Sequence, residues 1–476
     1  MTTRQVNNFG NNVCFTPAMY AEPTDEAGLL KLLEDHNDLS IRVIASGHAW
    51  SDAIKTDGLL INVKHFNEVR ISPQGDSVYV GAGCQIKCLA AALAEQGKSL
   101  PSSGLIDEQT VAGATATGTH GSGKNSLSHY VRSVRVVHFY KETGAPKAST
   151  ITGPSVELSA ARCSLGLLGV IVEVEMEIRP AYNILEYSAR YQTLDQVVAL
   201  EREYPLQQFY LMPWSWHWFG QHRTETTHAR SKLAGLYRVY WHLGIDWGLH
   251  LIIFALVKLM RVKGLIRFFF KRVLPLVVAK NWRVVDSSQK MLTMEHEIFR
   301  HIEIEVFVRR SDLKNALEEV KQTIQVFGGE AVSSDLQQQI PKSDHGTYQH
   351  HYPICIRRVL ADETLVSMTS PFHEKDSQDW YAISLICFEW PLCRHGFFGF
   401  ANFLASHMAT RFHARSHWGK YNPLDRRANQ QLYPRLDEFR SVVQKFDPES
   451  RFANEWLSNV LLSEADRGAQ VLSCDA

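Results

Sequence analysis

The sequence is short of several features, and each shortage excludes a class of protein. Its 8 cysteines include no Cys-X-X-Cys pair, and their spacing predicts neither a disulfide framework nor a metal site. Its 50 lysines and arginines are matched by 50 aspartates and glutamates, so no excess of positive charge indicates a nucleic-acid partner. We therefore expect reduced, structural thiols, no bound metal and no nucleic acid.

Uninterrupted apolar stretches are also short. The longest, residues 247–260, continues through 262–278, but six lysines and arginines interrupt it, so it lacks the roughly 20 apolar residues that cross a bilayer. One interpretation is a buried helical hairpin within an apolar insertion, residues 244–280. The other is peripheral membrane contact through 247–278, which the basic residues around Phe268–Phe270 favour. The chain start shows no basic segment followed by an apolar one, so we expect a cytoplasmic protein, with membrane association as the alternative.

Common catalytic and nucleotide-binding motifs are absent as well. No Walker lysine loop, HExxH zinc motif, GxSxG elbow or GxGxxG Rossmann loop occurs. What remains is a chain of 476 residues, 45% hydrophobic, which predicts two globular domains. Strands are predicted over 41–45, 58–63, 77–83, 131–140 and 169–180, and helices over 24–36 and 85–97. This alternation is typical of an α+β fold.

The composition changes after Pro180, where an aromatic run and the apolar helices follow. We therefore predict an N-terminal domain over residues 1–181 and a second domain over 182–425. A C-terminal segment, residues 426–476, is expected to return to the first domain.

Two loops in the first domain are rich in small residues. The segment ASGHAWSD (45–52) follows a predicted strand and presents His48, and SGLIDEQTVAGATATGTHGSGKNS (103–126) is dense in Gly, Ala, Thr and Ser. Small side chains let backbone amides approach a large flat or anionic group. The two loops together therefore indicate a nucleotide-type cofactor.

These loops resemble those of the vanillyl-alcohol-oxidase-type flavoproteins. ASGHAWSD is similar to their pyrophosphate loop, residues 103–123 to their second flavin loop, and SLGLLGVIVEVEMEIRP (164–180) to the strand that closes their FAD domain. HYPICIRRVLADETLVS (351–367) and SHWGKYN (416–422) resemble the C-terminal signatures of the sugar-lactone and alditol oxidase branch. That branch includes L-gulonolactone oxidase, D-arabinono-1,4-lactone oxidase and alditol oxidase.

The resemblance implies a PCMH-type FAD-binding domain with an α+β cap, and FAD as the cofactor. It implies a covalent bond between a ring nitrogen of His48 and the 8α-methyl group of the flavin. The cofactor-binding residues that it implies are Ile44, Ala45, Ser46, Gly47, His48 and Ala49 in the first loop, Thr110, Gly113, Thr115, Gly118 and Ser122 in the second, and Val172 in the closing strand.

On the substrate side the match has one departure. The branch carries proline, glutamate and arginine at alternate positions, and a lysine farther on. Here Pro353, Arg357 and Lys420 match, but the glutamate position is Cys355. Arg357 and Lys420 would suit substrate hydroxyls and negative charge on the flavin. A neutral thiol at Cys355 is a poor acceptor for a polyol hydroxyl, so weak activity on lactones is expected, with Cys355→Glu raising it. A substitute carboxylate is the alternative, with Glu295 as the candidate.

The resemblance implies oxidation of a sugar-derived lactone or polyol by hydride transfer to flavin N5. Oxygen is the expected electron acceptor, and a quinone or cytochrome is the alternative. Cys355 and the aromatic run over 209–219 favour a different, less polar alcohol instead. A flavin-bearing but non-catalytic, membrane-associated binding protein is the alternative from another class.

Overall fold

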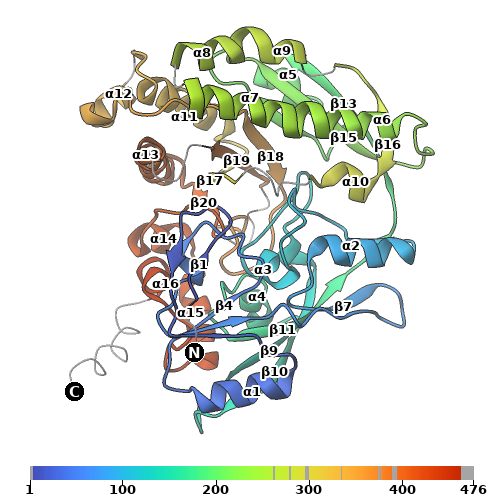
Figure 1. Cartoon of the computed structure of the whole chain (residues 1–476), viewed down its shortest axis with the longest axis vertical. Helices are drawn as coiled ribbons and strands as arrows, with labels where there is room; N and C mark the ends of the chain where they lie inside the picture. Colours follow the sequence, from blue (N-terminus) through green and yellow to red (C-terminus); the bar gives the residue numbers. More distant parts are fainter. Residues whose placement is uncertain are drawn as a thin grey trace.

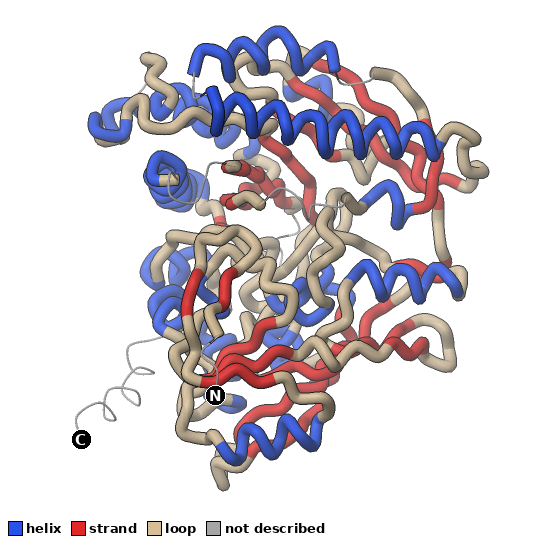
Figure 2. The backbone as a smooth tube through the Cα atoms, viewed as in Figure 1, coloured by secondary structure: helices blue, strands red, loops and turns tan. Residues whose placement is uncertain are grey.

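The computed structural model describes residues 4–260, 263–277, 280–294, 300–333, 335–373, 376, 378–388 and 394–462. Two α+β domains are stacked along the longest axis of the molecule (Figure 1). Each contains sheet and helices, as the colouring of the backbone shows (Figure 2). The two-domain α+β fold predicted from the sequence is therefore confirmed.

The N-terminal domain is built from short strands and helices. They are β1 (Val6–Asn7), β2 (Cys14–Phe15), β3 (Met19–Ala21), α1 (Glu26–Asp35), β4 (Ile41–Ile44), η1 (Asp52–Ile54), β5 (Leu59–Asn62), β6 (Val69–Ile71), β7 (Ser77–Gly81), α2 (Ile86–Glu95), β8 (Lys98–Ser99), α3 (Val111–Ala116), η2 (Leu127–Tyr130), β9 (Val131–Phe139), β10 (Pro146–Thr152), α4 (Val156–Ala161), β11 (Val170–Glu177) and β12 (Arg179–Pro180). The strands and helices predicted here are all present, with ends shifted by a few residues. The segment predicted as the second small-residue loop contains the short helix α3.

Two sheets form the framework of this domain. One is a three-stranded parallel sheet in the order β3-β5-β4, and the other is a five-stranded antiparallel sheet in the order β10-β9-β11-β7-β6. The central strand β5 reads Leu-Leu-Ile-Asn and is buried throughout, as expected for a strand covered on both faces. In β11 the valines and Met176 are buried while the glutamates are partly exposed, which is the period-two pattern of a half-buried strand.

The cap begins with β13, directly after the boundary predicted near residue 181. Its elements are β13 (Asn183–Tyr191), α5 (Leu194–Val198), β14 (Gln208–Leu211), β15 (Trp218–Thr226), β16 (Val284–Ser287), α10 (Ser288–Leu292), β17 (Ile302–Arg309), α11 (Leu313–Phe327), α12 (Asp335–Gln339), η6 (Lys342–Asp344), β18 (Ile354–Val359), β19 (Trp380–Cys387), α13 (His395–Phe412) and β20 (Arg415–Ser416). Its sheet has eight antiparallel strands in the order β16-β13-β15-β14-β18-β19-β17-β20. Helices α11 and α13 pack against each other and on β17.

A pair of apolar helices crosses the cap at the top of the molecule (Figure 1). They comprise α6 (Ala234–Tyr240), η3 (Trp241–Leu249), α7 (His250–Phe254), η4 (Ala255–Met260), α8 (Lys263–Phe268), η5 (Phe269–Val273) and α9 (Leu274–Val277), with π-helical hydrogen bonding in η3, η4 and η5. We call residues 234–277 the apolar hairpin. Its first helix, Ala234–Lys258, has 25 residues, and its most apolar 18-residue window has a mean hydropathy of 1.3, so by length and composition it could cross a membrane. The sequence analysis underestimated this length because the helix begins before the apolar run at residue 247.

The last helices, α14 (Arg426–Leu432), α15 (Leu436–Phe446) and α16 (Glu455–Val460), return to the N-terminal domain. Helix α15 packs on α4, and α16 packs on η1. The amide of Asn454 donates to the carbonyl oxygens of Asp52, at 2.8 Å, and Lys55, at 2.9 Å. The C-terminal helices thereby hold the segment that follows the first small-residue loop.

Candidate active site

A cavity of about 300 Å³ lies between the two domains. On the N-terminal side its wall consists of the loop after β4, the start of α3 and the segment before β11. On the cap side it consists of residues from β14, β15, β17, β18 and β19, the loop after β20 and the apolar hairpin. Of the residues predicted from the sequence, the wall includes Ile44, Ala45, Ser46, Gly47, His48, Ala49, Thr110, Gly113, Cys355, Arg357 and Lys420.

The first loop turns sharply at Gly47. This glycine has a φ of 67°, a conformation that side chains disfavour. Its carbonyl oxygen accepts a 2.8 Å hydrogen bond from the amide of Phe9, whose ring stacks on the His48 imidazole with 4.9 Å between centroids. The loop is therefore fixed from the N-terminal strand pair, and the histidine is held at the cavity wall.

The second loop approaches the cavity through the start of α3. Thr110 caps this helix, its side chain accepting from the amide of Gly113. A Cβ at Gly113 would lie 3.1 Å from the Thr110 hydroxyl, which is a tight contact. A glycine here therefore serves both the cap and the cavity wall.

Four predicted cofactor residues lie behind the wall rather than in it. They are Thr115, Gly118, Ser122 and Val172. The Thr115 hydroxyl donates to carbonyls of its own helix, and the Ser122 hydroxyl donates to the carbonyl oxygen of Gln207 in the cap. Gly118 leaves room for Met368, because a Cβ there would lie 2.8 Å from the methionine methyl group. The valine is a core residue of β11. The two hydroxyls are therefore engaged in hydrogen bonds away from the cavity.

One row of residues across the cap sheet forms the cap side of the cavity. Cross-strand pairing places Phe219 opposite Tyr210, Tyr210 opposite Cys355, Cys355 opposite Ser384, and Ser384 opposite Glu305. All five line the cavity. Directly opposed residues share one face of an antiparallel sheet, so their side chains line up. The wall therefore changes from aromatic to acidic along a single row.

The acidic end of this row is Glu305, which is fully buried and surrounded by donors. The Ser384 hydroxyl donates to its Oε1 at 2.6 Å, while His120 Nε2 lies 3.4 Å and Arg357 Nη2 lies 3.8 Å from the same oxygen. Burial raises the pKa of Glu305, but His120 and Arg357 together hold it well below its usual range. Glu305 is therefore a carboxylate at neutral pH.

A second carboxylate lies beside the first. Glu303 and Glu305 are two residues apart on β17, so both face the cavity. Glu303 accepts a hydrogen bond from Lys420 Nζ, which also lies 4.3 Å from the centroid of a Trp50 ring. The Trp50 indole donates to the carbonyl oxygen of His301 at 2.6 Å. Lys420 is thus held at the domain boundary by one residue from each domain.

His417 completes the polar end. Its Nδ1 accepts a 3.0 Å hydrogen bond from the amide of Gly419, and burial lowers its pKa well below the usual value. The ring is therefore neutral, with its proton on Nε2. Ligand-type atoms of His120, Glu305 and His417 lie within 4.8 Å of one another. Because Arg357 already supplies positive charge to this carboxylate, we assign these groups to hydrogen bonding.

Cys355 stands where the sequence analysis expected a family glutamate. Burial raises the pKa of its thiol, so it is neutral at physiological pH. Glu295, named as the alternative carboxylate, lies outside the described residues. The carboxylate that faces the cavity on the same row is Glu305, two strands from Cys355.

Glu303, Glu305 and His417 were missed in the sequence analysis. A usable signal was present in HIEIEVFVRR (301–310), where glutamates alternate with apolar residues in a strand that is otherwise suited to burial. Two carboxylates on one face of a buried strand need partners, which is typical of a functional site.

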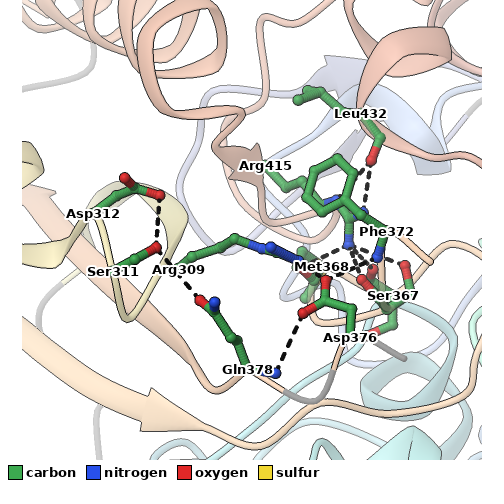
Figure 3. Close-up of polar contacts among 11 residues, drawn as sticks. Arg309, Ser311, Asp312, Ser367, Met368, Phe372, Asp376, Gln378, Arg415 and Leu432 are labelled. Carbon is green, nitrogen blue, oxygen red and sulfur yellow. Dashed lines mark hydrogen bonds and ion pairs between the residues drawn. The ribbon is translucent and has the colours of Figure 1, made fainter. Parts of the chain in front are cut away.

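The loop that carries His417 and Lys420 is fixed by the buried Arg415 (Figure 3). Its guanidinium donates to the carbonyl oxygens of Ser370, at 2.5 Å, and Leu432, at 2.6 Å, and lies 4.5 Å from the centroid of the Phe372 ring. Burial lowers its pKa to about 10, so it stays charged at neutral pH. One side chain thereby ties the segment after β20 to two others.

The N-terminal wall fits the FAD that the resemblance implies. Gly47 and Gly169 both line the cavity with positive φ, and a Cβ at Gly169 would lie 2.3 Å from the carbonyl oxygen of Val137. Backbone and small side chains predominate in both loops, which leaves amide groups near the space for a pyrophosphate. His48 borders the same cavity as the polar end of the cap row.

Comparison with known proteins supports an FAD-binding domain. Residues 17–142 match the family described as FAD binding domain, and residues 174–460 match the family described as D-arabinono-1,4-lactone oxidase. A long-chain alcohol oxidase of an uncultured marine euryarchaeote is 44% identical over 98% of both chains. An L-gulonolactone oxidase of Mus musculus is 24% identical over 96% of this chain and 98% of its own. Among solved structures, a cholesterol oxidase from B. sterolicum has the same fold, with a TM-score of 0.77 at 14% identity over 97% of both chains.

The matched families cover both domains, and the relatives span nearly the whole chain. The sugar-lactone oxidase branch suggested by the loops and by the 351–367 and 416–422 segments is therefore confirmed as the family, while the substrate is a separate question. The chain belongs to the D-arabinono-1,4-lactone oxidase family of FAD-dependent oxidoreductases.

Proposed function

We propose that the protein oxidises alcohols that carry a long apolar chain, with oxygen as the final electron acceptor. The observation that carries this proposal is the row from Phe219 to Glu305. A sugar lactone bears hydroxyls over its whole surface and would leave them unpaired against the ring of Phe219 and against Tyr210, whose own hydroxyl is engaged with Gln208 and Gln221. An alcohol with one hydroxyl and a hydrocarbon tail matches both ends of the row.

The cavity continues in the apolar direction beyond Phe219. Met212 follows β14, and Trp241, Leu249 and Leu274 of the apolar hairpin also line the wall. Each methylene group buried there contributes about 0.8 kcal/mol to binding. The printed name of the 44%-identical relative, a long-chain alcohol oxidase, supports the same substrate class.

Bound FAD supplies the acceptor for the hydride of the alcohol carbon. The chain's own groups hold the hydroxyl and take its proton. Glu305 is the proposed acceptor of that proton because of its position at the cavity wall. Its lowered pKa makes it a weak base, so it takes the proton as hydride loss makes the hydroxyl strongly acidic. Arg357 and Lys420 are the proposed cations that steady negative charge at the polar end, and Cys355 contributes a neutral surface beside them.

We also propose that His48 bonds covalently to the flavin. Its imidazole is held against the cavity by the stacked ring of Phe9, and its neighbours Gly47 and Ala49 are small. A fixed ring with room beside it suits this bond. The new N–C bond would replace a C–H bond of the flavin methyl group and the ring N–H bond, the two electrons would reduce the flavin, and oxygen, the proposed acceptor, would reoxidise it.

A second candidate substrate is a sugar-derived lactone or polyol. Glu303 and Glu305 offer carboxylate oxygens that accept hydrogen bonds from hydroxyls. Ser384, on the neighbouring strand, offers a hydroxyl that donates. This candidate needs its substrate confined to the polar end of the row.

An anaerobic reduction assay separates the two candidates. Purified yellow protein is mixed with primary alcohols of increasing chain length, or with L-gulono-1,4-lactone, and bleaching of the flavin is followed. We expect kcat/KM to rise about fourfold for each added methylene group until the cavity is full. Faster bleaching by the lactone than by any long-chain alcohol would contradict the proposal. Hydrogen peroxide formation in air tests the oxygen assignment.

A further inference from the structure

The apolar hairpin carries most of the exposed large hydrophobic residues in the described part of the chain. Eight of the ten lie on or next to it: Leu233, Leu236, Val239, Leu243, Trp247, Leu251, Ile252 and Phe268. The other two, Tyr140 and Val156, belong to the N-terminal domain. Single exposed hydrophobics are ordinary, but this concentration marks an interaction surface.

The exposed residues form a stripe along the first helix. Leu236, Val239, Leu243, Trp247 and Leu251 follow one another at intervals of three or four residues, and four of them are more than half exposed. Residues at this spacing share one face of a helix. At about 1.5 Å per residue the stripe is over 20 Å long.

The charge around the stripe is mostly positive, although Arg230 and Arg238 are paired with Asp286, and Arg267 with Glu330. Between residues 230 and 283 the sequence has eleven lysines and arginines and a single acidic residue, Asp246. Lys271 and Arg272 on the second helix are exposed, as are Lys232 before the hairpin and Lys280 after it. An apolar stripe bordered by cations is complementary to the surface of an anionic lipid bilayer.

The other face of the hairpin packs against the rest of the protein. Tyr237, Ile253 and Phe270 are buried, while Trp241 and Leu249 line the cavity. A quarter of the most apolar window of the first helix is buried in this way. One face of this helix is therefore packed on the cap, and the opposite face is the one available to lipid in the folded protein.

We propose that the exposed face of the apolar hairpin docks on an anionic lipid bilayer and that apolar alcohols pass from the bilayer into the cavity beside it. The hairpin lies at the top of the molecule, at the end remote from the N-terminal domain, so docking leaves that domain in water (Figure 1). The same helices border both the lipid-facing stripe and the cavity. The second half of this inference rests on the proposed function, and the first half does not.

Vesicle sedimentation of the purified holoenzyme tests the docking surface without any substrate. The vesicles contain phosphatidylcholine alone, or phosphatidylcholine and phosphatidylglycerol in equal parts. We expect binding to the mixed vesicles that high salt weakens. Leu243→Asp with Leu251→Asp, and separately Lys271→Glu with Arg272→Glu, should each reduce bound protein about tenfold. Val156→Asp, an exposed hydrophobic residue of the N-terminal domain, is the matched control and should bind as wild type does.

Three results would overturn the docking surface: no binding by wild type, equal binding by the stripe variants, or a wild-type dimer in light scattering that these variants convert to monomer. In the last case the stripe covers a second copy of the chain. Delivery is tested next, with a long-chain alcohol dissolved in the vesicles and a short water-soluble alcohol. The stripe variants should lose rate only on the first. Equal rates on both would refute delivery, whereas absence of activity on any alcohol by wild type would refute the proposed function instead.

Discussion

Cys355 and Glu305 lie in one row across the cap sheet, with Ser384 between them. The position that the family motif reserves for a glutamate holds a neutral thiol, and a carboxylate faces the same cavity from two strands away. Because the negative charge is on Glu305 and not at position 355, the site keeps a hydrogen-bond acceptor and the surface next to Tyr210 is uncharged. This arrangement suits a substrate with one hydroxyl and an apolar remainder.

Replacing Cys355 should have little effect on alcohol oxidation. Its thiol is neutral and its neighbour Ser384 already donates to Glu305, so Cys355→Ala should keep kcat/KM within about threefold of wild type. Ser384→Ala, on the same row, removes that donor and should cost about tenfold. Equal losses in the two variants would contradict the assignment.

Cys355→Glu is expected to lower activity on long-chain alcohols, whereas the gain predicted from the sequence concerns lactones and polyols. Two carboxylates on one buried row raise the pKa of one of them, and the new side chain occupies the uncharged part of the wall. Steady-state kinetics on an alcohol and a sugar lactone measure this. A gain on the alcohol would show that the row does not set substrate polarity.

His48→Ala should change how the flavin is retained. Acid precipitation of wild-type protein should leave the yellow colour in the pellet, because the proposed bond to His48 survives denaturation. The variant should release its flavin to the supernatant, while His65→Ala, at an exposed position, should behave as wild type. Complete release of flavin from wild type would rule out the covalent bond.

Arg415 should stabilise the protein through the buried hydrogen bonds that its guanidinium donates. Arg415→Leu leaves the carbonyl oxygens of Ser370 and Leu432 without their buried donor, so the free energy of unfolding should fall by about 3 kcal/mol or more. Arg411→Leu is the matched control. Arg411 is 67% exposed and its ion pair with Glu319 spans 3.6 Å, so its loss should cost under about 1 kcal/mol. Urea unfolding of both variants gives the comparison, and equal midpoints would contradict it.

Stability should fall when the pH drops below 6.5. Burial lowers the pKa of His350 to about 3 and that of His351 to about 4, whereas the unfolded chain binds these protons near 6.5. As the pH falls through this window, each of these histidines lowers the free energy of unfolding by up to about 1.4 kcal/mol per pH unit. Asp447, whose pKa burial raises to about 6, acts in the opposite direction below pH 6. The pKa of His222 is also lowered, to about 4. The histidines, which destabilise the fold as the pH falls, therefore outnumber Asp447, which stabilises it. The melting temperature should therefore decline between pH 6.5 and 5, and a constant or rising value would refute this.

The N-terminal half of the site could be predicted from the sequence because its residues lie in short, continuous motifs. The loop around His48 is recognisable by its small residues, and Arg357 lies in β18, which begins directly after Pro353. The cap row could not be read, because Phe219, Ser384 and Glu305 come from strands far apart in the chain and only the sheet register brings them together. Four residues of the second loop and closing strand, placed at the cofactor by resemblance, do not line the cavity.

The most direct test of the account is the kinetics of Glu305→Gln on a long-chain alcohol. Glutamine keeps the shape of the side chain but cannot take a proton, so kcat/KM should fall about a hundredfold or more while the bound flavin is retained. Glu142→Gln, an exposed residue of the N-terminal domain, should match wild type. A Glu305→Gln variant within about threefold of wild type would show that another group accepts the hydroxyl proton, and that the polar end of the row is not where the alcohol binds.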